Sequence, residues 1–350
     1  MPSIYKLNLS YNRFFSPRFR AGVNLLWSKT VNNYVYYDRN IVDQPYFTLS
    51  NEGGRGVFVP ANTIPANGST DWTKGRKAND LGRVLELESE GILNQAAIVI
   101  DASVRFGKDG YFTISYTKND TQDNTSFDCC VANTSTFRAI KDDPRDQTMA
   151  YSDFQFSDKL VMNAATPTVA GFQLGAIFNG VGGTRYSFLT GGNKSINGDF
   201  VLTNDLAFVF DPNNSAVPTT IQTGIKGLLD NPDVTQSVKD YITKSLGKVA
   251  ERNGGINPFY STVDLRLTKD VKIYKNHALS LSADCFNFMN LLDKTKGVSY
   301  NHGNINLVTM TTFDQKTMNY NYNVEAGAGR KLSSAGGTPW RIQLGARYAF

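Results

Sequence analysis

Alternation of apolar and polar side chains with a period of two residues is the feature of this sequence that most constrains its fold. In residues 262–273, apolar side chains occupy the alternate positions with one exception. Asp264, Arg266, Thr268 and Asp270 lie between these apolar positions. A strand places successive side chains on opposite faces, so this segment predicts a strand with one apolar and one polar face. The apolar positions are Val263, Leu265, Leu267, Val271 and Ile273.

The same alternation recurs along the chain, which predicts an all-β fold. It is present in residues 5–11, 18–27, 98–106, 112–117, 279–285 and 340–350. The 17 Tyr and 22 Phe agree with strands, because aromatic side chains fit a pleated, half-buried surface. No run of about 18 apolar residues exists, which excludes a transmembrane helix. The net charge is only +5, with no long block of one sign, so nucleic acid is not an expected partner.

The predicted connections between strands alternate in length. Short turns are expected near residues 13–17, 107–110, 164–168, 274–277 and 314–317, and long polar loops near 38–91, 119–150, 182–257, 293–303 and 329–338. Membrane barrels have tight periplasmic turns and long extracellular loops. The chain is therefore predicted to form a transmembrane antiparallel β-barrel segment of about 11 strands, as one unit over residues 1–350.

One helix is expected inside the longest loop. Val234, Val238, Tyr241, Ile242 and Leu246 are spaced three and four residues apart, after Asp233 as the candidate N-cap. It is either an amphipathic helix that packs on the loop or a gating or partner-binding helix.

Several segments together resemble TonB-dependent outer-membrane receptors, in the Oar-like branch found in Bacteroidota. They are WRIQLGARYAF (Trp340–Phe350), ERNGGINPFYSTVDLRLTKDVKI (Glu251–Ile273) with HALSLSADCFNFMNLLD (His277–Asp293), TNDLAFVFD (Thr203–Asp211) and SVRFGKDGYFTISYT (Ser103–Thr117). The resemblance covers about residues 92–350 and implies the C-terminal half of a barrel of about 22 strands, multi-pass in the outer membrane and surrounded by its lipid.

The family implies energised uptake of a scarce ligand, with a plug in the lumen and a TonB complex reached through an N-terminal part. No signal peptide, TonB box or plug is recognised in this sequence, so the chain is expected to be truncated. Loops choose the ligand, and a peptide, a glycan and a metal chelate stay open. The alternatives are a passive porin-like or structural barrel and a secreted β-rich binding module.

The last strand carries the expected assembly signal. Ile342, Leu344, Ala346, Tyr348 and Phe350 form one apolar row. The resemblance implies that Tyr348 and Phe350 at this end are read by the barrel-assembly machinery. The alternative is a last strand with an interfacial aromatic.

Four charged side chains face the barrel lumen by parity. They are Asp264, Arg266, Asp284 and Arg347, and they either contact a plug or satisfy one another in a wet interior.

A calcium site and a catalytic triad are the other kinds of chemistry that the sequence could offer. Asp199, Asp205 and Asp211, with Asn204 beside them, offer the oxygen ligands that Ca²⁺ prefers, but their spacing is not that of an EF-hand. The two histidines, His277 and His302, have no nucleophile and third partner in a recognisable pattern, so neither an enzyme nor a cofactor is predicted.

The three cysteines give no zinc or redox motif. Cys129 and Cys130 are adjacent, which leaves open a vicinal disulfide, a bond to a partner or two ordinary loop residues. Cys285 occupies an apolar strand position and is interpreted as a small hydrophobic residue.

Overall fold

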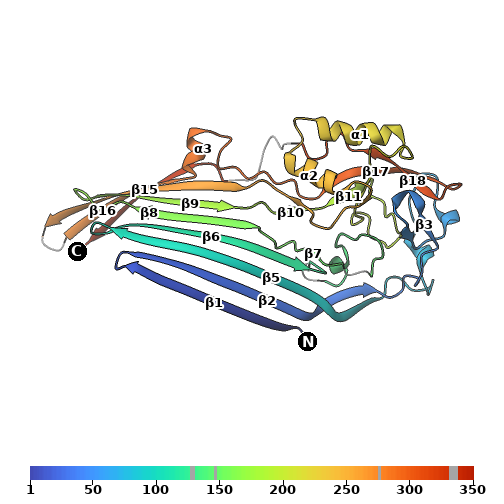
Figure 1. Ribbon diagram of the computed structural model, residues 1–350, viewed down its shortest axis with the longest axis horizontal. Coiled ribbons are helices and arrows are strands. Elements are labelled where there is room, and N and C mark those ends of the chain that lie inside the picture. Colours follow the sequence, from blue (N-terminus) through green and yellow to red (C-terminus); the bar gives the residue numbers. More distant parts are fainter. Residues whose placement is uncertain (127–130, 146–147, 275–276, 331–337) are drawn as a thin grey trace.

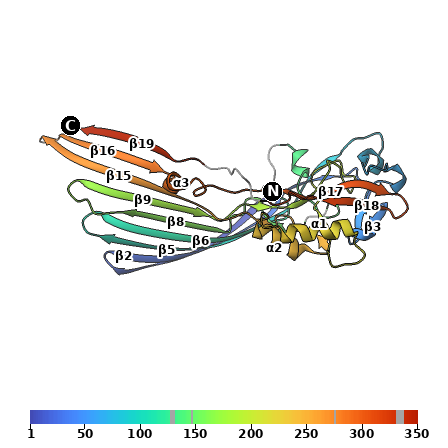
Figure 2. The same ribbon diagram turned by 90° about the horizontal axis from the view of Figure 1, so that it is seen from above.

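A long antiparallel sheet and a compact cap make up the molecule, with the sheet at one end and the cap at the other (Figure 1). The computed structural model describes residues 1–350 except 127–130, 146–147, 275–276 and 331–337. The view from above shows the same separation, with the C-terminus at the end of the sheet that is remote from the cap (Figure 2).

Within the described residues, the main sheet is a path of nine strands, and each strand is antiparallel to its neighbours. In spatial order they are β1 (Ser3–Ser16), β2 (Phe19–Asp38), β5 (Leu85–Phe106), β6 (Gly110–Asp123), β8 (Asp158–Ala165), β9 (Phe172–Val181), β15 (Tyr260–Tyr274), β16 (His277–Phe286) and β19 (Arg341–Ala349). The short β7 (Ala150–Tyr151) also pairs with β6. The predicted all-β antiparallel architecture is confirmed, and in this structure the sheet is open, since β1 and β19 do not pair.

Connection length separates the two ends of the sheet. Residues 17–18, 107–109 and 166–171 form tight connections at the end remote from the cap. The long connections 39–84, 124–157, 182–259 and 287–340 all leave from the opposite end (Figure 1). Most of the cap is built from them.

The cap is defined here by its short strands and two helices. They are β3 (Phe47–Leu49), β4 (Arg55–Val57), β10 (Arg185–Tyr186), β11 (Phe188–Gly191), β12 (Phe208–Val209), α1 (Thr219–Asp230), α2 (Gln236–Ser245), β13 (Lys248–Val249), β14 (Gly255–Ile256), β17 (Ile305–Asp314) and β18 (Asn319–Val324). Its hydrophobic core joins side chains from three of the long connections, including Val57, Phe188, Ile242 and Leu307, each fully buried. The cap therefore holds distant parts of the sequence together.

The hairpin 305–324 corrects the sequence-based strand count. It was expected to be two barrel strands around a short turn near residues 314–317. Instead β17 pairs in parallel with β11 and antiparallel with β18, which places the hairpin in the cap. The main path accordingly has nine strands among the described residues, rather than about 11.

The helix expected in the longest loop is present as α2, although Thr235, not Asp233, is its N-cap residue. Val238, Tyr241 and Ile242 are buried in the cap core, so α2 packs on its own loop. The preceding α1 was not expected. A short α3 (Phe288–Leu292) packs against β15. No helix in the described ranges is long and apolar enough to cross a membrane.

Candidate functional site

One row of directly paired residues with apolar side chains crosses eight strands of the sheet. Directly paired residues on neighbouring strands lie on the same face, so the pairing identifies one continuous surface. The row consists of Phe19, Val104, Phe112, Ala164, Ala176, Leu265, Cys285 and Ile342. Together with the rows above and below, it forms what we call the apolar belt.

The apolar belt runs obliquely to the strands. On β2 the apolar segment extends from Phe19 to Trp27, and the row passes through Phe19, at the end of the segment that is remote from the cap. On β19 the same row passes through Ile342, at the cap end of an apolar segment that continues to Phe350. The belt thus shifts by about eight residues over seven strand-to-strand steps. With about 3.3 Å per residue and about 4.8 Å between strands, the strands are tilted by roughly 40° to the normal of the belt.

Large apolar side chains in the apolar belt are open to solvent. Leu9 is 63% exposed, Leu25 45% and Leu344 78%. Soluble monomers rarely expose a continuous apolar surface of this extent. The belt therefore requires contact with an apolar environment. Its oblique course matches the strand tilt of 35–45° found in membrane barrels.

Aromatic side chains border the apolar belt. Trp27 and Trp340 lie at its edge toward the cap, while the rings of Phe15 and Phe19 stack at 5.3 Å near the tight connections. Lys269 is the cation within the belt on β15. Its Nζ lies 4.0 Å from the centre of the ring of Phe172 and donates to the carbonyl of Ala170 at 2.5 Å, outside the strands. Interfacial aromatics and a snorkelling lysine are typical of a membrane boundary.

The four charges predicted for the lumen lie on the polar face, opposite the apolar belt. Arg266 and Asp284 are directly paired across β15 and β16, with Nε and Oδ1 3.5 Å apart. Asp264 accepts a hydrogen bond from the backbone N–H of Asn287 at 2.7 Å. Arg347 is paired with Ser280, so of the four charges only Arg266 and Asp284 are direct neighbours across two strands. A lumen role stays a prediction.

A polar-face cluster that the sequence did not single out lies at the other edge of the sheet. The guanidinium of Arg20 on β2 donates to Asn12 on β1 and to Asp101 on β5. Side chains from three strands thereby satisfy one another on this face. All three lie on the polar side of their strands, and their proximity depends on the strand register.

The end of β19 is exposed at the free edge of the sheet. Tyr348 is 53% exposed and Phe350 91%. The Tyr348 hydroxyl lies 2.7 Å from Nδ1 of His277, and the two rings stack at 5.7 Å. The aromatic end is thus held against the β15–β16 hairpin, and the assembly-signal role of Tyr348 and Phe350 stays a prediction.

The proposed calcium ligands are occupied by contacts within the cap. Asp199 accepts hydrogen bonds from Asn204 Nδ2 at 3.1 Å and from the N–H of Val201 at 2.9 Å, and Asp205 accepts one from the N–H of Ile196 at 2.7 Å. In the described part of the chain, no three His, Cys, Asp or Glu side chains are grouped to hold a metal ion. The structure therefore does not bring Asp199, Asp205 and Asp211 together as a ligand set.

The buried Asp205 makes cap stability depend on pH. Burial, together with the nearby carboxylate of Asp199, raises the pKa of Asp205 to about 7. Between the unfolded pKa of about 3.9 and this value, only the folded state holds the proton, so stability falls as the pH rises, by up to about 1.4 kcal/mol per unit. We expect Asp205→Asn to flatten this dependence between pH 5 and 8 in urea unfolding followed by Trp72 fluorescence. Equal slopes in Asp205→Asn and in the exposed control Asp233→Asn would contradict the assignment.

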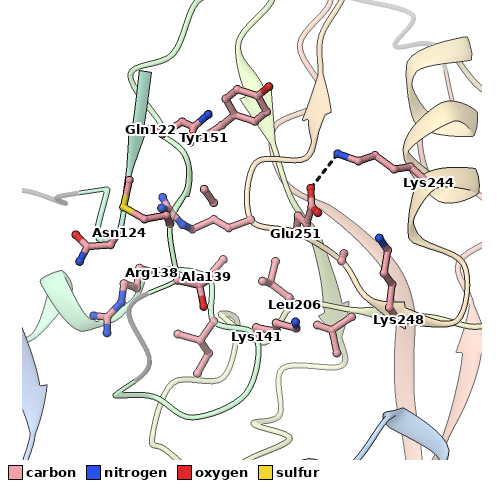
Figure 3. A pocket seen from close by; sticks show the side chains of 17 residues that line it. Gln122, Asn124, Arg138, Ala139, Lys141, Tyr151, Leu206, Lys244, Lys248 and Glu251 are labelled. Carbon is pink, nitrogen blue, oxygen red and sulfur yellow. Dashed lines mark hydrogen bonds and ion pairs between the residues drawn. The ribbon is translucent and has the colours of Figure 1, made fainter. Parts of the chain in front are cut away.

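A cavity of about 480 Å³ lies where β6 and β7 meet the cap. Buried apolar residues contribute to its wall, namely Ile140, Leu206, Val249 and Ala250. Backbone hydrogen bonds of 2.9 Å join Leu206 to Ile140, and Ala250 to Ala207, so this wall is tied into the cap. Lys141, Lys244 and Lys248 also line the cavity, and Figure 3 shows Lys244 and Lys248 on the side of α2.

A single carboxylate lies among these lysines. Lys244 Nζ donates to Glu251 Oε2 at 2.9 Å, and this bond lowers the pKa of Glu251; Lys248 and Lys141 act in the same direction. The side chains of Lys141 and Lys248 make no hydrogen bond or ion pair with other residues that the structure describes. The lysine group thus carries more positive charge than Glu251 neutralises.

Arg252 also reaches the cavity, but its charge is committed to the sheet. It donates to the Asp123 carboxylate at 2.8 Å and to the Asp123 carbonyl at 2.6 Å, and also to Ser126. The side chains of Arg252 and Asp123 are only 7% and 2% exposed. This buried ion pair connects the cap to the end of β6.

The remaining sequence-based candidates are not part of this cavity. Cys129 and Cys130 lie outside the described residues, so their predicted pairing is not addressed. Cys285 is an unpaired, half-buried thiol in the apolar belt. His302 contacts Thr235 Oγ1 at 3.3 Å and the ring of Tyr186 at 5.8 Å, and burial lowers its pKa.

Comparison with known proteins gives one structural likeness to report. No family model and no curated protein matches the chain. Among solved structures, the outer membrane transporter YddB from Escherichia coli matches 99% of this chain with 10% sequence identity and a TM-score of 0.44. The match covers 33% of that transporter, so the chain spans about a third of its length.

Proposed function

We propose that this chain forms part of the wall and the extracellular cap of an outer-membrane β-barrel transporter. The observation that carries the proposal is the apolar belt, which crosses the sheet obliquely at the tilt expected for strands in a bilayer. On β2 the apolar side chains from Phe19 to Trp27 extend over about 26 Å along the strand, or roughly 20 Å along the belt normal after tilting. That height is close to the apolar band of about 25 Å in outer-membrane barrels.

The polar face and the loops give the proposal its orientation. The face opposite the belt carries ion pairs such as Arg20 with Asp101, which suits a wet interior. Tight connections lie on one side of the belt and the cap on the other (Figure 1). By the loop asymmetry of outer-membrane barrels, the cap lies outside the cell and the tight connections lie in the periplasm.

Tryptophan quenching by brominated lipids tests the position of the belt. Trp27 and Trp340 border the belt, whereas Trp72 lies in the long connection 39–84, where its ring meets Phe200 edge-on at 5.2 Å. In vesicles of lipid brominated near the headgroup, we expect strong quenching in Trp72→Phe, which keeps the two belt tryptophans. The double variant Trp27→Phe with Trp340→Phe retains Trp72 and should be quenched little. Similar quenching of both variants would rule out the membrane position of the belt.

Within this proposal, TonB-dependent uptake is the more specific form suggested by the sequence resemblance. Uptake would then require an energised inner membrane, whereas a passive barrel would conduct without it. Ligand uptake that persists unchanged after treatment of cells with a protonophore would favour the passive barrel.

A further inference from the structure

We propose that the cavity beside α2 binds a small organic anion that combines a carboxylate with an apolar body. This inference deepens the proposed function, since it assigns a ligand class to the extracellular cap. It rests on the cavity lining and on the excess positive charge of Lys141, Lys244 and Lys248.

The cavity lies on the aqueous side of the proposed membrane boundary. On β6, the last belt residue toward the cap is Tyr116, and Gln122 in the cavity lining lies six residues farther along the same strand. Six residues of a strand extend over about 20 Å. A ligand in the cavity is therefore in contact with the cap and with the extended end of the sheet, away from the belt.

The lining combines two kinds of surface. Ile140, Leu206, Val249 and Ala250 are 5%, 2%, 8% and 0% exposed and present an apolar wall fixed by the cap core. Lysine side chains stand beside this wall. A volume of about 480 Å³ lies in the usual range of small-molecule sites, in which apolar walls supply contact area and a few polar groups fix orientation.

Some cationic side chains at the cavity already have partners in the protein, and others remain able to bind an anion. Arg252 is held by Asp123, and Arg138 donates to the carbonyl of Pro144 at 3.0 Å. Lys244 is paired with Glu251. Lys141 and Lys248 have no such partner among the described residues, and both act on Glu251 electrostatically. These two ammonium groups are the anion contacts that the arrangement provides.

The test is calorimetric titration of the full chain in lipid nanodiscs with 2-naphthoate, with the titration of empty nanodiscs subtracted. We expect saturable binding of 2-naphthoate, weaker binding at high salt, and little binding of the neutral 2-naphthamide. The double variant Lys141→Gln with Lys248→Gln should raise the Kd by about tenfold, the effect of roughly 1.4 kcal/mol in lost attraction. Replacing both lysines with arginine should retain binding.

Lys226→Gln with Lys239→Gln is the matched control, because it removes the same charge from α1 and α2 at positions that do not line the cavity. The control should leave the Kd unchanged. Equal weakening in both double variants, equal affinity for the amide, or no saturable binding of 2-naphthoate would each overturn the anion site. Failure here with normal bromolipid quenching would remove the ligand site alone, whereas failed quenching would remove the proposed membrane function.

Discussion

Leu267→Arg is expected to lower the free energy of unfolding from a bilayer by about 2–4 kcal/mol, the cost of a cation near the middle of the lipid-facing surface of a barrel. Leu267 lies near the centre of the apolar belt on β15, paired with Leu174 on one side and Ala283 on the other. Urea titration of the protein in lipid vesicles measures the loss. The large effect follows from burial of the guanidinium in hydrocarbon.

Thr268→Arg is the matched control on the next residue of the same strand. Thr268 lies on the opposite face, paired with Gln173 and Ser282, where the proposal places water. This substitution should change the folding free energy by less than about 1 kcal/mol. If both arginines cost the same, the two faces of β15 do not meet different solvents, and the proposed membrane wall is wrong.

Arg252→Ala is expected to destabilise the cap by about 3–5 kcal/mol, because it leaves the Asp123 carboxylate buried and unpaired. Arg252 makes hydrogen bonds with both the carboxylate and the carbonyl of Asp123, and with Ser126. Urea unfolding followed by Trp72 fluorescence, in the variant that lacks Trp27 and Trp340, gives the change in the cap.

Two further variants identify the cause of that loss. Adding Asp123→Asn to Arg252→Ala should restore part of the stability, since no buried charge then lacks a partner. Lys244→Ala breaks the solvent-exposed pair with Glu251 and should cost no more than about 1 kcal/mol. A loss in Lys244→Ala as large as that in Arg252→Ala would show that burial of the Arg252 pair is not the source of the effect.

Local alternation sufficed to predict most of the main sheet, because each long strand has one apolar face whatever its partner. The expectation from turn lengths was wrong for residues 305–324, which do not belong to the main sheet. Leu307, Met310 and Phe313 are buried in the cap core, and only contacts with β11 and the loop 39–84 reveal that environment. The helix α1 was missed because Gly224 and Gly227 reduce helix propensity. Gly224 is needed there, since an added Cβ would lie 2.7 Å from Val324 on β18.

The cavity could not be predicted from the sequence for a related reason. Its lining comes from the end of β6, the segments 138–141 and 148–151, Leu206, Lys244 and the segment 248–252. None of these pieces contains a motif, and only the packing of the cap brings the lysines to one apolar wall. The polar-face charges were easier to predict, because parity alone fixes the side of a strand on which Asp264, Arg266, Asp284 and Arg347 lie.

The direction of the two edge strands limits how the sheet can become a ring. Across the nine strands of the described main path, neighbours alternate in direction, so β1 and β19 run the same way. In a common membrane orientation, the β1 edge of one copy can only meet the β19 edge of another in parallel. A ring of identical protomers with an entirely antiparallel wall is thus geometrically forbidden. An antiparallel ring requires an odd number of additional strands whose outermost members both run opposite to β1.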